Sequence, residues 1–471
     1  MIYLSNEKKE IKTPSEIMLS NEVEYETTTS RRNVFFWAMY DLANTIYSMV
    51  IVSLIINRYV LVIGQLEYGM SYGDVSFLYG FVSFLMQLIV AVCVPILGAL
   101  SDNVGKRKPF VISLTGIILL FASLLGFFHD ITMVLIFYVI ANVAYQFSLT
   151  FYDAMLPFIA KREDIGKVAG FGVAWGYLGT ILALVVMYPL ILLLGDTVSS
   201  PPILPGDPPV QYGFSGYWFT FLIPMILFLL CAIPFIYVRE KQRKGERPGI
   251  GKLIKNTFKQ LGSTFKDIRK HKSMFIFIIG YFFVADIANV IVLYMTPIVT
   301  DGLIIAGGST LFAIIFIIIA TMSAVAFTYF VGKFGDKYGA KNTFFLVGAL
   351  WGISLTMGIV LVFATPYINV GLNLPFIFSL LMGIVAGPAL GGTWTAQRIM
   401  VTELAPKEKF GEFFGFSKLS GKLSSALGPF IWGTVMLTYD LIGKTAYGWA
   451  MVSVGIIMGI GILIISFVKR D

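Results

Sequence analysis

Two acidic residues lie inside apolar stretches of the sequence, and each is followed by an amide. Asp41 precedes Asn44 and Asp286 precedes Asn289, so in a helix each amide lies on the same face as its acid. A charged side chain in such a stretch costs about 3 kcal/mol or more, and it usually has a partner or lines a water-filled path. We therefore expect one or both aspartates to bind a coupling proton, a cation or the ammonium group of a substrate. The alternative is a structural hydrogen-bonded pair.

Two lysines near the C-terminus offer the opposite charge. Lys418 and Lys422 are four residues apart, so they share one face of a helix. They could hold the carboxylate or phosphate of a substrate, or they could pair with Asp41 or Asp286. The alternative is a lysine–aspartate bridge that only holds the helices together.

A third pair of charges lies toward the ends of apolar segments. We expect Asp153 and Arg398 to lie near the cytoplasmic ends of two membrane spans that an internal repeat relates to each other. The hypothesis is a salt bridge between two groups of helices that holds an inner gate closed. The alternative is that both side chains contact lipid headgroups.

The residues that most enzymes and metal sites need are scarce. The sequence has two histidines, His129 and His271, in or beside predicted loops, and two cysteines, Cys93 and Cys231, in apolar segments. This argues against a disulfide framework, a metal site and acid–base catalysis by histidine. We expect no enzyme activity and no cofactor. Because the chain has no nucleotide-binding G-x-x-x-x-G-K-[ST] motif, a gradient must drive any transport.

The composition is typical of a polytopic membrane protein. Of 471 residues, 57% are hydrophobic and 13% are charged, and the mean hydropathy is +0.81. Soluble domains are about 45–50% apolar and about 25% charged, which excludes a soluble enzyme, a disordered chain and a fibrous chain. Twelve segments are long enough to cross a membrane as helices, near residues 34–56, 74–97, 109–128, 131–155, 167–194, 216–238, 273–299, 309–331, 343–364, 374–397, 411–437 and 446–468.

The basic residues predict how these spans are oriented. With twelve spans both termini lie on one side, and that side receives almost all basic loops, including Arg31, Arg32, Lys106, Arg107, Lys108, Lys161, Arg162, Lys333, Lys337, Lys341, Lys407, Lys409, Lys469 and Arg470. The other side receives only Arg58 and Lys444. Because basic loops stay in the cytoplasm, we expect both termini there, in an integral multi-pass protein of the cytoplasmic membrane.

The spans divide the chain into four parts. We expect a cytoplasmic polar tail over 1–33, an N-terminal six-helix bundle over 34–238, a basic cytoplasmic linker over 239–272 and a C-terminal six-helix bundle over 273–471. The linker has one apolar stripe at helical spacing, which predicts an amphipathic helix on the inner membrane surface. The stripe consists of Ile254, Phe258, Leu261, Phe265 and Ile268.

The two bundles have related sequences. A shift of 245 residues, the separation of Asp41 and Asp286, also aligns Asp153 with Arg398 and several glycines of spans 5 and 11. The loop 98–107 resembles the loop 332–341 at a slightly different shift. Two parallel six-span repeats that face each other form a transporter architecture, in which substrate binds near the bilayer midplane and one half rocks against the other.

The motifs of these segments resemble a known family. Gly98-Ala-Leu-Ser-Asp-Asn-Val-Gly-Lys-Arg-Lys108 is similar to the loop G-x-L-x-D-x-x-G-x-[RK]-[RK] of the major facilitator superfamily. Three more stretches resemble its vacuole-effluxer-like branch: Trp37-Ala-Met-Tyr-Asp-Leu-Ala-Asn44, Phe151-Tyr-Asp-Ala-Met-Leu-Pro157, and Gly411-Glu-Phe-Phe-Gly-Phe416 with Gly421-Lys422 and Gly428-Pro429. Asp153 departs from the pattern, where a neutral residue is expected.

The resemblance implies an all-α membrane protein with twelve transmembrane helices in two pseudo-symmetric six-helix bundles. Of the two lysines, it favours Lys422 as a site residue. It also assigns a conformational, gating role to the loop residues. Gly105 permits a tight turn, Arg107 anchors the loop to the inner face, and Asp102 interacts with the N-terminus of a neighbouring helix, which the resemblance suggests is span 11. Asp336 holds the corresponding place in the second copy.

The function that this reasoning favours is secondary active transport of a small polar solute. A substrate with both an ammonium and a carboxylate group would match the aspartates and the lysines, as an amino acid or small peptide does, and eukaryotic relatives are thought to release amino acids from the vacuole. The alternatives are a proton-coupled carrier of an organic anion or sugar, and a transporter-like sensor or lipid-handling protein without turnover. We expect a monomer whose partners are a small-molecule substrate, a coupling proton or cation, and membrane lipids, but no nucleic acid.

Overall fold

The structure is a computed structural model, and it describes residues 29–103, 106–160, 165–194, 217–240, 250–302, 310–364, 373–405 and 410–469. Within these ranges every regular element is a helix. The predicted tail up to residue 28 lies outside the described residues, as do Gly105 and the side chains of Asp102 and Asp336.

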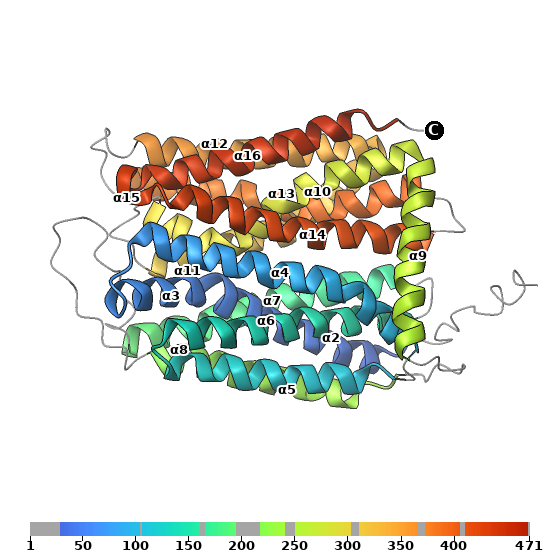
Figure 1. Ribbon diagram of the computed structural model, residues 1–471, viewed down its shortest axis with the longest axis horizontal. Helices are drawn as coiled ribbons and strands as arrows, with labels where there is room; N and C mark the ends of the chain where they lie inside the picture. The colour runs from blue at the N-terminus through green and yellow to red at the C-terminus, as the bar shows by residue number, and fades with distance from the viewer. Residues whose placement is uncertain are drawn as a thin grey trace, which may run out of the picture.

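The N-terminal half contains six long helical rods that run side by side (Figure 1). The first rod joins three segments, with a π-helix in the middle. The rods are α2 (Arg31–Ile46) with η1 (Tyr47–Ile55) and α3 (Ile56–Leu66), α4 (Tyr72–Asn103), α5 (Lys108–Leu124) with η2 (Leu125–Phe127), α6 (Ile131–Asp153), α7 (Ile165–Leu194), and α8 (Tyr217–Ala232) with η6 (Ile233–Tyr237). The short η3 (Leu156–Phe158) follows α6.

The C-terminal half repeats this plan. Its rods are α10 (Lys272–Pro297) with η7 (Ile298–Gly302), α11 (Thr310–Tyr338), α12 (Ala340–Ala364), α13 (Asn373–Leu404), α14 (Phe410–Met436) and α16 (Thr445–Ser466), with the short α15 (Tyr439–Ile442) before the last. We call the end of the bundle where α2 begins and α16 ends the inner end, following the predicted orientation, and the opposite end the outer end (Figure 1).

The rods are twelve transmembrane helices, as the sequence predicted. Ten of them are long and apolar enough to cross a membrane, judged on the described residues. The other two are α7, whose described apolar part is the short stretch Trp175–Met187, and α14, whose hydropathy is lowered by glycine, serine and lysine residues. Both lie among the other rods (Figure 1).

The helix ends differ from the prediction where polar residues occur inside a helix. The first rod continues to Leu66 instead of ending near residue 56. The sequence analysis ended the span near residue 56 and counted Arg58 with the outer side, but the side chains of Asn57 and Arg58 are buried, with 5% and 6% of their surface exposed. α4, α11 and α13 also continue past the apolar stretch at the inner end.

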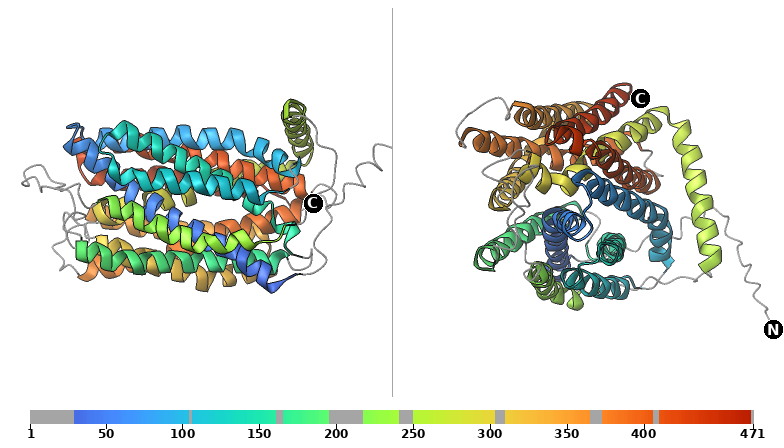
Figure 2. Two further views of the ribbon diagram at one scale, coloured as in Figure 1. Left: turned by 90° about the horizontal axis from the view of Figure 1, so that it is seen from below. Right: turned by 60° about the vertical axis from the view of Figure 1, so that its left-hand side comes forward.

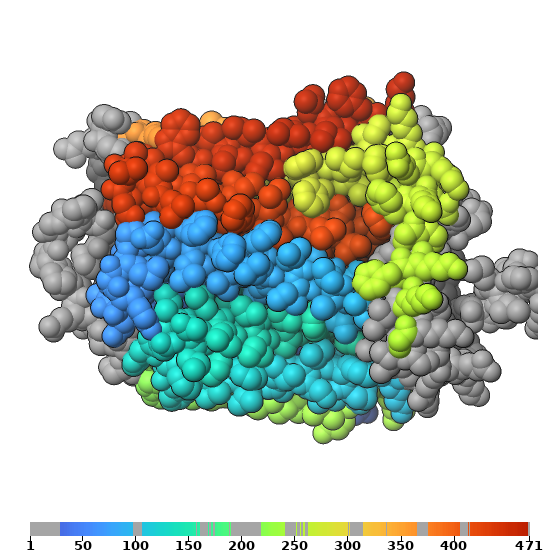
Figure 3. Space-filling model, viewed as in Figure 1, coloured from blue at the N-terminus to red at the C-terminus, as the bar shows by residue number. Residues whose placement is uncertain are grey.

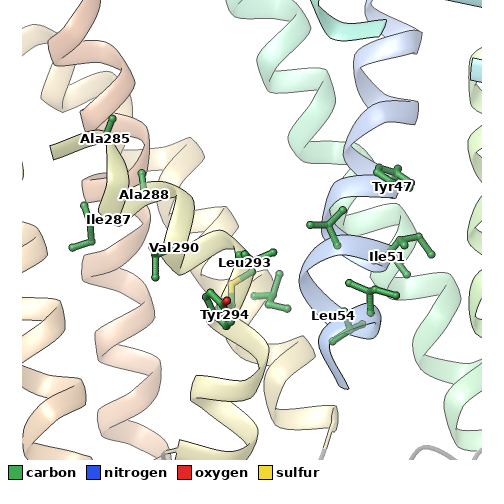
Figure 4. Close-up of a cluster of buried hydrophobic side chains, with 14 of the residues drawn as sticks. Tyr47, Ile51, Leu54, Ala285, Ile287, Ala288, Val290, Leu293 and Tyr294 are labelled. Carbon is green, nitrogen blue, oxygen red and sulfur yellow. The ribbon is translucent and has the colours of Figure 1, made fainter. Parts of the chain in front are cut away.

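The two halves meet along a seam between α4 and α14 (Figure 3). Glycines allow the two backbones to approach closely, as is common in membrane helix pairs. A Cβ atom added to Gly433 would lie 3.2 Å from the Cα of Phe77 and 3.3 Å from the Cα of Gly80. A second contact joins the first rod to α10, and Figure 4 shows the apolar side chains that these two elements contribute, among them Ile51 and Leu293.

The predicted amphipathic helix of the linker is present as α9 (Ile250–Lys270). It lies across the inner end of the bundle and runs along the outside of the other helices (Figures 1 and 2). Ile268 of the predicted stripe is buried, and the Phe265 ring contacts the rings of Phe275 on α10 and Phe416 on α14. Phe258 remains 49% exposed.

The close packing of α4 on α14 makes a prediction about stability. Gly433→Val places carbon atoms against the backbone of α4, so it should lower the free energy of unfolding by about 1–3 kcal/mol and lower the apparent Tm of the purified protein. Gly459→Val on α16 is the matched control, because no atom lies within 4 Å of a Cβ there. Equal melting temperatures for the two variants would contradict this account of the seam.

Candidate functional site

Asp41 lies where two helices of the N-terminal half approach each other. It is on α2, and a Cβ added to Gly172 of α7 would lie 3.1 Å from its Oδ2 atom. The glycine therefore leaves room for the carboxylate, which is half-buried. Among the described residues the carboxylate has no hydrogen-bond partner, and it interacts electrostatically with the like charge of Asp153. Such a group is free to take an external cation or proton.

Asp286 has a different environment. It is fully buried, and its Oδ1 atom accepts a hydrogen bond of 2.9 Å from the backbone N–H of Gly428 on α14. Gly428 precedes Pro429, which interrupts the hydrogen bonding within that helix. Asp286 thus ties α10 to α14 within one half, an arrangement that favours the structural alternative for this residue.

The acids and amides do not pair with each other. The Asn289 amide donates a hydrogen bond of 3.0 Å to the backbone oxygen of Ala285 in its own helix. Asn44 is 2% exposed, and neither its Oδ1 nor its Nδ2 has a partner among the described residues. The i to i+3 spacing placed each amide on the face of its acid, but neighbouring helices decide its contacts.

Both lysines of α14 reach across to α6 of the other half. Lys418 Nζ lies 3.7 Å from Asp153 Oδ2, and these side chains are 51% and 60% exposed. Lys422 Nζ donates a hydrogen bond of 2.5 Å to Gln146 Oε1. Gln146 was not predicted, because it has no charge and belongs to none of the motifs. Its only signal is its position two turns before Asp153 on the same helix.

The predicted ion pair between Asp153 and Arg398 is not formed in this structure. Asp153 pairs with Lys418 instead, because α14 and not α13 presents a cation to the end of α6. Arg398 on α13 is exposed, and its charge acts on Tyr177 and Tyr281. The gating role of Asp153 and Arg398 stays a prediction.

These side chains form what we call the inner polar cluster: Asp41, Gln146, Asp153, Arg398, Lys418 and Lys422. Its acidic members come from the N-terminal half and its basic members from the C-terminal half. The charges of Asp41 and Arg398 both act on the Tyr177 hydroxyl of α7. A solute with charges of both signs could therefore replace the contacts that the halves make with each other.

An apolar cavity of about 50 Å³ adjoins this cluster at Tyr177. Both halves line it, with Met49 and Tyr177 from the N-terminal half and Ile291, Phe316, Trp351 and Leu390 among the residues from the C-terminal half. Its walls are almost entirely apolar. It has room for a small apolar group next to the charged groups.

The loop motif holds its basic residue in a buried ion pair. Arg107 Nη1 lies 3.5 Å from Glu240 Oε1, with side-chain exposures of 2% and 1%, and the guanidinium lies over the Phe158 ring. Glu240 also accepts hydrogen bonds from the backbone N–H groups of Arg107 and Lys108, so it caps α5. Arg107 thus has a buried anion as a partner, and the sequence analysis did not single out Glu240 because it lies in the linker sequence.

A similar contact occurs in the second half. Lys108 Nζ donates to the backbone oxygen of Val238 at 3.1 Å, which ties the start of α5 to the end of the sixth rod. Lys341 Nζ donates to the backbone oxygen of Val468 at 3.0 Å, which ties the start of α12 to the end of α16. These contacts match the duplication that the sequence predicted.

Comparison with known proteins shows the family of this chain. The model of the family described as "Vacuole effluxer Atg22 like" matches residues 68–471. The chain belongs to this family. The uncharacterized MFS-type transporter YxiO of Bacillus subtilis is 27% identical over 92% of this chain and 94% of its own length. The predicted branch of the major facilitator superfamily is thereby confirmed.

Solved structures confirm the fold of this Atg22-like protein. The nucleoside transporter NupG superimposes with a TM-score of 0.66 at 14% identity, covering 94% of this chain and 100% of its own. A D-xylose–proton symporter gives a TM-score of 0.68 at 14% identity, covering 93% and 98%. The chain is thus an integral multi-pass membrane transporter of the major facilitator type.

The buried pair at the loop motif makes a second prediction about stability. Glu240→Gln removes the carboxylate charge that the buried Arg107 guanidinium contacts, so it should lower the free energy of unfolding by about 3–5 kcal/mol. Asp267→Asn is the control. The Asp267 Oδ1 atom lies 3.0 Å from Nζ of Lys270, and the Lys270 side chain is 76% exposed. Surface pairs of this kind contribute about 0–1 kcal/mol to stability. Thermal unfolding of both variants in one detergent tests this, and a Glu240→Gln variant as stable as the control would refute it.

Proposed function

We propose that this transporter moves a small polar solute by alternating access, in which the halves rock about the α4–α14 seam. The observation that carries the proposal is the inner polar cluster, where acids of one half face bases of the other. A solute bound there contacts both halves at once. Its binding can therefore change the contacts that hold the halves together, which is what alternating access requires.

The charge pattern favours a zwitterion, such as an amino acid or a small peptide. An ammonium group fits beside Asp41 and Asp153, and a carboxylate fits beside Lys422 and Arg398. The apolar cavity at Tyr177 accepts a side chain next to these groups. An organic anion is the second candidate, because the cluster holds three basic groups against two acids.

Transport is coupled to a proton or cation through Asp41 in this proposal. Asp41 is half-buried and unpartnered within the described part of the chain, whereas Asp286 already accepts a backbone hydrogen bond. The protein works in the cytoplasmic membrane with both termini in the cytoplasm. The basic residues at the inner end support that orientation.

A ligand screen by thermal shift on the purified protein tests the substrate class. A compound that binds the native state raises the apparent Tm, and we expect hits among amino acids or short peptides. Hits confined to organic anions or sugars would contradict the proposal of a zwitterionic substrate. Binding without flux of the same compound into sealed proteoliposomes would overturn transport and favour a sensor.

The role of Lys422 can be tested with the compound that binds. Lys422→Met should weaken its binding about tenfold or more, because a charged hydrogen bond to the substrate is lost. Lys259→Met, at an exposed position of α9, removes an equal charge from a residue outside the cluster and should leave binding unchanged. Unchanged affinity in a folded Lys422→Met protein would exclude this lysine from the site.

The role of Asp41 in coupling can be tested by measuring gradient-driven uptake and substrate exchange separately. Asp41→Asn should abolish uptake driven by an ion gradient and retain exchange of labelled for unlabelled substrate, since exchange needs no net ion movement. Asp74→Asn, an exposed acid at the start of α4, is the control and should keep both activities. Intact gradient-driven uptake in both Asp41→Asn and Asp286→Asn would show that neither acid carries the coupling ion.

A further inference from the structure

The outer end of the bundle contains a second polar cluster between the halves. The Tyr72 hydroxyl donates a hydrogen bond of 2.9 Å to Asp301 Oδ2, and it also contacts the Tyr447 hydroxyl. Tyr72 is at the start of α4 in the N-terminal half, whereas Asp301 on η7 and Tyr447 on α16 belong to the C-terminal half. All three side chains are buried, with at most 5% of their surface exposed.

Arg58 adds a positive charge to the same place. It lies on α3 of the N-terminal half, is 6% exposed, and has no hydrogen-bond partner for any guanidinium nitrogen within the described residues. Asp301 Oδ1 is also without a partner there. Both charges act on the Tyr447 hydroxyl. A buried charge is costly unless an opposite charge compensates it, and Arg58 brings a charge opposite to that of Asp301 to the Tyr447 hydroxyl from the other half.

A further contact between the halves lies deeper in the bundle. The Thr296 hydroxyl of α10 donates a hydrogen bond of 2.5 Å to the backbone oxygen of Ser53 in the π-helix η1. A π-helix is uncommon and frequently marks a functional site. The outer end is thus closed by polar contacts at two levels, in the same structure in which Asp153 and Lys418 are exposed at the inner end.

We propose that Tyr72, Asp301, Tyr447 and Arg58 form an outer latch, which holds the outer ends of the two halves together. The latch must break before the molecule opens outward, so its strength sets how often the outward-open state occurs. The inference uses the alternating access of the proposed function, but it concerns a different set of residues and makes a prediction that needs no substrate.

The tyrosine ring that stacks on Tyr72 provides a matched control. Tyr439 on α15 has its ring centroid 4.1 Å from that of Tyr72, but its hydroxyl has no partner among the described residues. Tyr72→Phe removes a hydroxyl that joins the halves by hydrogen bonds. Tyr439→Phe removes a hydroxyl that has no hydrogen-bond partner among the described residues. Glu67→Gln, which changes an exposed acid after α3 at the outer end, is the corresponding control for Asp301→Asn.

The test measures how accessible a buried position is from the outer side. Cys93 and Cys231 are replaced by alanine, and Ser53→Cys introduces a reporter at a site that is 1% exposed. The variants are reconstituted with one orientation and treated with a membrane-impermeant maleimide. We expect Asp301→Asn and Tyr72→Phe to increase the labelling rate about tenfold, the change in population that loss of a charged hydrogen bond produces. The Tyr439→Phe and Glu67→Gln rates should stay within about twofold of the parent.

Each outcome decides the proposal. Equal labelling of Tyr72→Phe and the parent would refute the latch, even if Asp301→Asn failed to fold. If Tyr439→Phe increased the labelling rate as much as Tyr72→Phe, ring packing and not the hydrogen bond would close the outer end. That result would also refute the latch. Absence of substrate flux in the parent protein would contradict the proposed function and leave the labelling result as a separate statement about the outer latch.

Discussion

The cost of a charge inside a membrane protein governs this structure. A charge buried in a helix bundle must find a partner, a cavity or a bound ligand. This chain meets the requirement in three ways. Arg107 and Glu240 form a closed pair that fixes the inner loop. Lys418 and Asp153 pair while both remain exposed. Arg58 and Asp301 are buried on opposite sides of the boundary, and both act on the Tyr447 hydroxyl. The first pair belongs to the scaffold, and the other two lie where, in the proposed mechanism, the halves separate.

The position of the charges relative to the halves connects packing to function. The closed pair of Arg107 lies within the N-terminal half and its linker, so it can persist while the halves move. The contacts of Lys418 and Lys422 cross from one half to the other, so motion or a ligand must break them. Between the two ends, glycines bring α4 and α14 into close contact, and such a contact can act as a pivot because it has no long side chains to rearrange.

The two aspartates of the repeat show how duplicated sequences diverge in role. Asp41 lies beside a glycine of α7 and keeps its carboxylate free among the described residues. Asp286 accepts the N–H of Gly428 beside a proline of α14, so it supports the shape of that helix. The same acid at the same place in the repeat therefore has no hydrogen-bond partner among the described residues in one half and a backbone hydrogen bond in the other. The lysines of α14 add to this asymmetry.

The sequence by itself determined the twelve helices, the duplication, the family and the set of charged residues in the spans. Apolar length, basic loops and motif spacing are local properties of the chain, so each can be read without the fold. Only the tertiary structure decided which groups meet. It paired Asp153 with Lys418 instead of Arg398, brought the uncharged Gln146 to Lys422, and buried Arg58 where a loop was expected. Such contacts depend on how helices distant in sequence pack and rotate against each other, and no local pattern of residues encodes that rotation.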